Sequence, residues 1–275
     1  MSRILSILVG LGFLAALAWG FITTPHEAAV ETATEEFHRG VKDVSFSFDG
    51  PFGKYDRQEL QRGFQVYKEV CSACHSMKLV AFRDLEEIGF SKPEVKALAK
   101  GWSTEVPSIN PDTGEATTRK AIPSDYFPSP YANETAARAA NNNALPPDLS
   151  LIAKAREHGP HYTFSILTGY QDQPAELLKK FPDAKTPTGL HYNPYFANLN
   201  IAMPPPLVAE GQVTYSDGTK ATIEQEAHDV TTFLAWAAEP KMEDRKRMGL
   251  GVLIFLVVLA GVLFAAYRRV WKDAH

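Results

Sequence analysis

The only two cysteines of the chain lie three residues apart, and they constrain the fold more than any other feature. They are Cys71 and Cys74, and His75 follows directly. Cys-x-x-Cys-His is the attachment signature of c-type haem, in which two thiols add to the haem vinyl groups and the imidazole reaches the iron from the same side. We therefore expect a domain with one covalent haem as its core, held by Cys71 and Cys74, with His75 as an axial iron ligand.

Three other uses of this cysteine pair compete with haem. A structural disulfide is common in exported proteins, but two cysteines three residues apart in a helical stretch suit a redox-active dithiol better. A zinc site needs four Cys or His ligands, usually as paired motifs, and the sequence has no second pair. A thioredoxin-like site needs a strand before the motif, whereas the pattern before Cys71 predicts a helix. Haem fits best.

A low-spin electron carrier needs a second axial ligand, generally Met or His. Met203 stands before three prolines that fix the backbone φ near −65°, so its thioether can be held against iron. The other methionines are terminal, too close to His75, or at a membrane junction: Met1, Met77, Met242 and Met248. The alternatives are a Met203 that fills a core gap, or a histidine ligand, although His158, His161 and His191 are better explained as surface or loop residues.

Two stretches without charge stand near the ends of the chain, residues 4–22 and 248–266, each 19 residues long. At about 1.5 Å of rise per residue, either could cross the roughly 30 Å hydrocarbon core as a helix. Arg268, Arg269 and Trp271 follow the second stretch and are typical of headgroup level. We predict a transmembrane helix over 248–267, since a buried core helix would show a polar face.

The first apolar stretch is either a signal peptide or a signal-anchor helix, over residues 1–25. It exceeds the roughly 7–15 residues of a usual signal core, and residues 23–29 offer only a weak cleavage site. Both alternatives export the chain that comes after this stretch. We expect an exported haem domain over 26–240, a juxtamembrane linker over 241–247 and a cytoplasmic tail over 268–275.

The exported segment is acidic. Residues 26–240 hold 20 Lys and Arg against 29 Asp and Glu, a net charge of −9, compared with −4 for the whole chain. This charge argues against nucleic acid as a partner and favours a basic protein attracted by long-range electrostatics. Solubility alone is the other explanation.

Two helices are predicted on either side of the haem-binding residues. Residues 56–59 read as a capping box, and Leu60, Phe64 and Tyr67 then form one apolar face that leads to Cys71. A second box, at residues 222–225, begins a helix with an apolar face at Ala227, Val230, Leu234 and Ala237. It ends before Pro240. This arrangement is typical of a class I cytochrome c fold, which is mainly α.

Long loop insertions separate these helices. Residues 101–150 carry seven prolines and predict a long loop with one short helix over 132–140. Residues 212–220 read as solvated surface or as a small hairpin that turns at Asp217 and Gly218.

An ordered set of motifs resembles the cytochrome c1 family. The set comprises residues 62–67, 71–77, 124–128, 143–150, 167–170, 203–206 and 236–240. The resemblance implies the haem subunit of ubiquinol–cytochrome c reductase, the cytochrome bc1 complex. In that family the subunit takes an electron from the Rieske iron–sulfur protein and passes it to a soluble cytochrome c. For this chain the acidic charge predicts that this cytochrome c is basic. It also implies cytochrome b and the lipid bilayer as neighbours, with the haem domain on the periplasmic side of a bacterial inner membrane.

The resemblance also assigns site residues. It gives the axial roles to His75 and Met203, and it places an Arg and a Tyr near a haem propionate, at positions that match Arg119 and Tyr126. Some bacterial members carry a further cysteine pair in this domain, which this chain lacks.

With both axial positions filled, the iron has no open coordination site, so we expect electron transfer and no active site in the chain itself. A haem c peroxidase or a nitrite-reducing enzyme would need an open or displaceable sixth position. A membrane-tethered cytochrome c shuttle and the haem c subunit of a terminal oxidase are the non-enzymatic alternatives.

Overall fold

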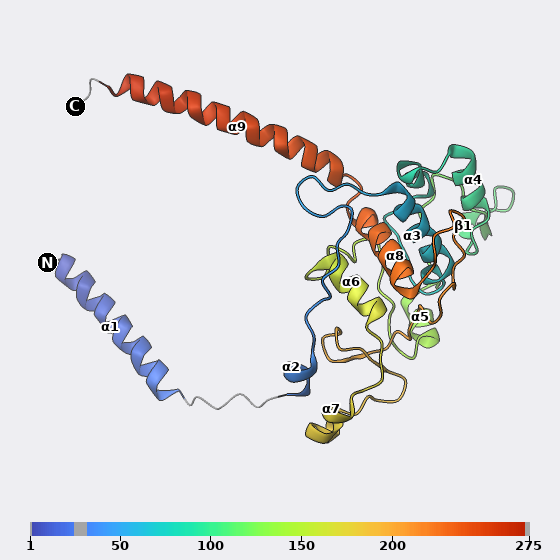
Figure 1. Cartoon of the computed structure of the whole chain (residues 1–275), viewed down its shortest axis with the longest axis horizontal. Coiled ribbons are helices and arrows are strands. Elements are labelled where there is room, and N and C mark those ends of the chain that lie inside the picture. The colour runs from blue at the N-terminus through green and yellow to red at the C-terminus, as the bar shows by residue number, and fades with distance from the viewer. Residues whose placement is uncertain (1, 25–31, 273–275) are drawn as a thin grey trace.

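A computed structural model describes residues 2–24 and 32–272, and it places one long helix near each end of the chain, outside the folded domain (Figure 1). They are α1 (Ser2–Thr23) and α9 (Met242–Val270), and both are long and apolar enough to cross a membrane. The juxtamembrane linker predicted over 241–247 is helical from its second residue, because it is the start of α9. The helix also continues past the predicted end at residue 267. Most of the weak cleavage sequence, from residue 25 onward, lies outside the described residues.

The helix predicted before the cysteines is α3 (Arg57–Glu69). Asp56 caps it, since its carboxylate accepts from two backbone amides of the first turn at 2.8 and 3.2 Å. The capping box is only half formed, because the Glu59 carboxylate accepts from the Ser47 hydroxyl at 3.0 Å. The predicted apolar face is buried, and the 3-10 turn η1 (Cys71–Ala73) follows the helix directly.

The closing helix is α8 (Ile223–Ala238), capped by the Thr222 hydroxyl, which accepts from the Gln225 amide at 3.1 Å. Its predicted apolar face is buried, and it packs across α3. A Cβ added to Gly63 on α3 would lie 2.0 Å from the Asp229 carbonyl oxygen on α8. The two backbones therefore touch, which only glycine permits at this crossing.

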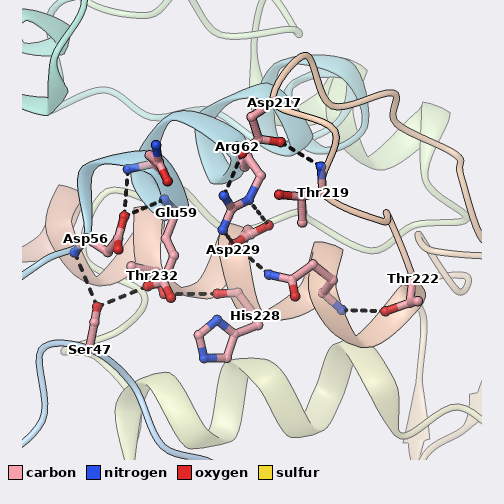
Figure 2. Close-up of polar contacts among 12 residues, drawn as sticks. Ser47, Asp56, Glu59, Arg62, Asp217, Thr219, Thr222, His228, Asp229 and Thr232 are labelled. Carbon is pink, nitrogen blue, oxygen red and sulfur yellow. Dashed lines mark hydrogen bonds and ion pairs between the residues drawn. The ribbon is translucent and has the colours of Figure 1, made fainter.

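A buried ion pair fixes the same crossing (Figure 2). Arg62 on α3 donates to both carboxylate oxygens of Asp229 at 2.8 and 3.0 Å, and Asp229 is fully buried. A third N–H of Arg62 reaches Asp217 at 2.8 Å. The Thr219 amide and Arg62 together lower the pKa of Asp217 to about 2. The network attaches the loop before α8 to both helices.

An aromatic cluster fills the core beside this helix pair. Phe64 from α3 packs edge-on against Phe233 from α8, with ring centroids 5.7 Å apart. Trp102 and Phe127 stack at 5.0 Å, and Tyr67 joins them at 6.4 and 5.9 Å. Burying each such side chain contributes roughly 1.5–3 kcal/mol before conformational entropy is counted. The core therefore lies against the helix that leads to the cysteines.

The rest of the domain is short elements joined by loops. The helices and 3-10 turns are α2 (Ala33–Phe37), η2 (Phe82–Ile88), α4 (Lys92–Lys100), α5 (Glu134–Ala140), α6 (Gly159–Thr168), α7 (Ala175–Lys180) and η3 (Pro182–Ala184). Two antiparallel pairs complete it: β1 (Val106–Ile109) with β2 (Ala116–Arg119), and β3 (His191–Tyr192) with β4 (Asn200–Ile201).

The predicted mainly α class is confirmed, as is the short helix in the proline-rich insertion. That helix is α5, which begins two residues late because Asn133 caps it, accepting from the Ala136 amide at 2.9 Å. Residues 212–220, predicted as either solvated surface or a small hairpin, do not form a hairpin. The turn at residues 216–217 joins irregular segments, while β1 and β2 form a hairpin inside the insertion.

Candidate functional site

The attachment residues occupy a single turn after α3. The amides of Cys74 and His75 both donate to the Cys71 carbonyl, at 3.1 and 2.9 Å, so both thiols lie on one tight turn. The preceding element is a helix, as predicted, and not the strand of a thioredoxin-like site. Burial, with a smaller contribution from Cys74, raises the pKa of the Cys71 thiol to about 12. A redox-active dithiol needs a thiolate at neutral pH, so this environment disfavours that alternative.

His75 is oriented by a proline carbonyl. Its Nδ1 lies 2.8 Å from the Pro147 oxygen. A carbonyl can only accept, so Nδ1 carries the hydrogen and the neutral ring presents the lone pair of Nε2. Burial lowers the pKa of His75, which favours this neutral form. A ligating histidine is commonly oriented in this way through its second nitrogen.

The segment that supplies this carbonyl is itself fastened to the attachment turn. Asp148 accepts from the Ser76 hydroxyl at 2.8 Å and from the amides of Lys78 and Ser150 at 2.9 Å each. Burial raises the pKa of Asp148, but these hydrogen bonds outweigh burial and hold the pKa below its usual range. Asp148 therefore stays ionised and fixes the position of Pro147.

Met203 lies two residues beyond β4 and is half-buried. The Tyr170 hydroxyl, just after α6, donates to the Met203 carbonyl at 3.0 Å. Burial raises the pKa of Tyr170, so the phenol remains a donor at any physiological pH. One hydrogen bond before the three prolines thus restrains the methionine backbone.

The other methionines are occupied elsewhere. Met77 and Met242 are core residues, 0% and 4% exposed, while Met248 is 66% exposed on α9. These positions agree with the elimination made from sequence and leave Met203 as the candidate.

Among the competing histidines, His158 is exposed and His161 packs its ring edge-to-face on Phe46 with centroids 5.4 Å apart. His191 differs from them. It lies on β3 and pairs with Ile201, which precedes Met203 by two residues. His191 also lines an open hollow with Tyr170 and Pro205. It is the histidine to test against Met203.

Arg119 and Tyr126 are placed less simply. Arg119 forms a two-pronged pair with Asp125 at 2.5 and 2.8 Å, so its charge is already balanced. The pair raises the pKa of Arg119 and lowers that of Asp125. The Tyr126 residue is 53% exposed, and its backbone bridges to Ala81.

Arg156 and Tyr162 form a second arginine–tyrosine pair. Burial raises the pKa of Tyr162, and the charge and hydrogen bond of Arg156 oppose that shift. Tyr162 is also close enough to Tyr170 to affect its pKa. Sequence reasoning missed the roles of Pro147 and Tyr170, because each acts through a contact that joins segments distant along the chain. It also gave no role to the pair of Arg156 and Tyr162.

The donor set as a whole fits haem c. Two thiols on one turn, an oriented neutral imidazole and a restrained thioether are the groups that such a haem uses. Within residues 2–24 and 32–272, no three His, Cys, Asp or Glu side chains are grouped to hold a metal ion by themselves.

The sequence matches the Cytochrome C1 family over residues 46–274. It is 47% identical over 245 residues to the cytochrome b/c1 of Bradyrhizobium diazoefficiens, with 84% of this chain and 35% of that protein covered. The chain therefore spans about a third of that longer relative. It is 47% identical to the cytochrome c1 of Rhodospirillum rubrum, covering 83% of this chain and 86% of that one. The mitochondrial cytochrome c1 1, heme protein, of Arabidopsis thaliana is 46% identical, with coverages of 94% and 81%.

Proposed function

The chain belongs to the cytochrome c1 family, and we propose that it is the haem-bearing electron-transfer subunit of a cytochrome bc1 complex. It binds one haem c, attached through Cys71 and Cys74, with His75 and Met203 as the axial ligands. When bound, such a haem accepts and donates one electron reversibly. The observation that carries the proposal is the His75 imidazole directly after the attachment pair, which burial keeps neutral and the Pro147 carbonyl orients.

The residues of the chain would position the haem and keep other ligands away from the iron. Cys71 and Cys74 hold the cofactor edge, and the Asp148 contacts keep Pro147 and hence His75 in place. Tyr170 and the prolines hold Met203 on the other side. With both axial positions filled, the chain has no active site of its own. It acts as the electron-carrying subunit of the enzyme quinol–cytochrome c reductase.

The electron comes from the Rieske iron–sulfur protein and leaves to a soluble, basic cytochrome c. The net charge of −9 over residues 26–240 supports a basic acceptor. Cytochrome b is the membrane neighbour, and the name of the Bradyrhizobium relative joins b and c1 in one protein. Reduction of the acceptor should slow steeply as salt screens the attraction. A rate that does not change with ionic strength would contradict the charge-steering part.

The haem domain lies on the periplasmic side of a bacterial inner membrane, with the C-terminus in the cytoplasm. The order of the elements supports this placement, because α1 precedes the domain in sequence, α9 follows it, and each helix is long enough to cross a membrane. Whether residues 1–25 act as a cleaved signal or a retained anchor stays open between the two predictions.

Two arginines are candidates for a haem propionate. Arg119 and Tyr126 follow from the family resemblance, whereas Arg156 interacts with Tyr162, which is close enough to Tyr170 to affect its pKa. Because the guanidinium of Arg119 is already paired with Asp125, we favour Arg156 as the propionate partner. We expect R156Q to lower the midpoint potential more than R119Q, because removing a cation near an ionised propionate stabilises the oxidised, more positive state. The reverse ranking would return the role to Arg119.

The axial assignment is tested with the holoprotein by M203L and, as a matched control, H191N. M203L should keep the covalent haem, lose the far-red absorption band of sulfur-ligated ferric haem and lower the midpoint potential, since a thioether favours the reduced metal. H191N should keep both. A wild type without the band, together with a midpoint potential that H191N changes and M203L does not, would identify His191 as the ligand in place of Met203. Release of haem from the denatured wild-type chain by acid acetone would refute covalent attachment. Ready binding of carbon monoxide to the reduced protein would indicate an open coordination site on the iron, and hence an enzyme.

A further inference from the structure

Phe52 stands at the tip of a tight turn just before α3 and is 76% exposed. The turn is rigid. The Lys54 amide donates to the Ser47 carbonyl at 3.0 Å, and Gly50 adopts a φ of +69°. A Cβ on Gly53 would lie 2.1 Å from the Asp49 carbonyl oxygen, so the backbone is closed on itself there. The ring is therefore held outward by the turn, rather than left outside by a loose loop.

The same turn is fastened to the first two turns of α9. The Lys246 ammonium donates to the carbonyls of Phe48 and Gly53, at 2.7 and 3.2 Å. The Tyr55 amide donates to the Glu243 carboxylate at 3.1 Å. In Figure 1 the loop before α3 lies beside the start of α9. These three bonds fix the height of the Phe52 turn along the axis of α9.

That height is where the apolar part of α9 begins. Lys246 precedes Met248, the first residue of the charge-free stretch, by two residues, which is about 3 Å along a helix. If α9 crosses a bilayer, the turn meets it at the level of the lipid headgroups.

The surroundings of Phe52 have the composition of a membrane interface. Five cations stand on the turn and at the start of α9, beside the three carboxylates Asp49, Glu243 and Asp244: Lys54, Lys241, Arg245, Lys246 and Arg247. Lys241 also pairs with Glu87, and Arg245 with Glu239. Cations next to an exposed aromatic ring suit anionic headgroups over a shallow apolar layer. A water-exposed site would gain nothing from a phenyl ring held outward in this way.

We propose that the Phe52 turn is a second membrane contact, in which the phenyl ring enters the headgroup layer of an anionic bilayer beside α9. The inference rests on the proposed membrane anchoring by α9. Two contacts, one helix and one turn, fix the tilt of the haem domain above the membrane, which a single helix would not do.

The test is depth measurement by electron paramagnetic resonance on the full-length holoprotein in nanodiscs that contain anionic phospholipid. A nitroxide is attached to F52C, to I109C as a water-exposed reference and to V257C as a mid-helix reference. The replaced residues are 76%, 69% and 72% exposed, so they are matched in accessibility. Relaxation by oxygen, which concentrates in lipid, is compared with relaxation by a water-soluble nickel chelate.

We expect the oxygen-to-nickel ratio at F52C to exceed that at I109C several-fold and to fall below that at V257C. A ratio equal to that at I109C would overturn the proposal. So would a label shielded from both reagents, because it would then pack against protein. A nickel-accessible V257C would mean that α9 does not span, which is failure of the anchoring itself. Label uptake by the wild-type chain would instead show that Cys71 and Cys74 are not bonded to haem.

Discussion

The two sides of the candidate haem site are built differently. On the cysteine side, α3 and α8 cross with touching backbones, a buried ion pair and a cluster of packed aromatic rings. On the methionine side, Met203 lies in a loop after a two-residue strand pair, restrained by one hydrogen bond from Tyr170. The side proposed to form the covalent bonds is thus also the rigid one. We therefore expect the methionine side to unfold first.

The largest effect is expected at the helix crossing. G63V would place a branched side chain where a Cβ already meets the Asp229 carbonyl at 2.0 Å. Neither backbone can move without losing the Arg62–Asp229 pair, so the loss should exceed about 4 kcal/mol, the range of exceptional mutants. We expect no soluble or membrane-inserted holoprotein by haem staining of cells.

The matched control is G40V, at a glycine where an added Cβ has no heavy atom within 4 Å. It should accumulate to wild-type levels. Normal haem content in G63V would show that the crossing is looser than the touching backbones require.

A smaller but still large effect is expected from R62M. It leaves the fully buried Asp229 carboxylate without its cation (Figure 2), and breaking a buried pair in this way costs about 3–5 kcal/mol. Denaturant unfolding of the holoprotein at pH 7 measures it. D217N, which removes only the exposed partner of Arg62, should lose far less. Equal losses would mean that the outer partner, and not the buried one, stabilises the crossing.

The sequence predicted the cysteine side well because its signals are local. The cap at Asp56, the apolar face through Tyr67 and the cysteine spacing all act within a few turns of one helix. Met203 is predicted from the elimination of the other methionines, from the three prolines after it and from the family resemblance, because no helical pattern marks it as a ligand. The contacts that orient the site, from Pro147 to His75 and from Tyr170 to Met203, join residues 72 and 33 positions apart. Single-sequence periodicity carries no information about such pairs.

Y170F should affect the methionine side alone. It removes one hydrogen bond to the Met203 carbonyl, worth about 0.5–1.5 kcal/mol, without changing the shape of the ring. The far-red band of the ferric holoprotein should disappear at lower temperature than in wild type, while denaturant unfolding followed by helix content changes little. A shift of both transitions together would show that the two sides unfold as one unit.

The smallest effect tests whether the two sides communicate, through Glu226 on α8. This residue is fully buried, and its Oε1 accepts from the Val213 amide, at 2.9 Å, in the segment after the methionine loop. The second oxygen, Oε2, has no hydrogen-bond partner among the described residues. Burial is the main reason that the pKa of Glu226 is raised, and Asp229 and Glu69 add to it.

A raised folded-state pKa means that the neutral carboxyl stabilises the fold fully below the unfolded pKa, and that this contribution is lost as pH rises through the folded value. E226Q keeps the acceptor for Val213 and removes the charge, so its melting temperature should match wild type below the unfolded pKa and exceed it increasingly as pH rises toward the folded pKa, with a constant excess above that. E224Q, an exposed neighbour, should show no such trend. Because ionised Glu226 would strain the contact that joins α8 to the methionine segment, the far-red band of wild type should weaken over the same pH interval and persist in E226Q. A melting difference that grows with pH while the band stays constant would confine the effect to the helix pair and show that the methionine side is independent of it.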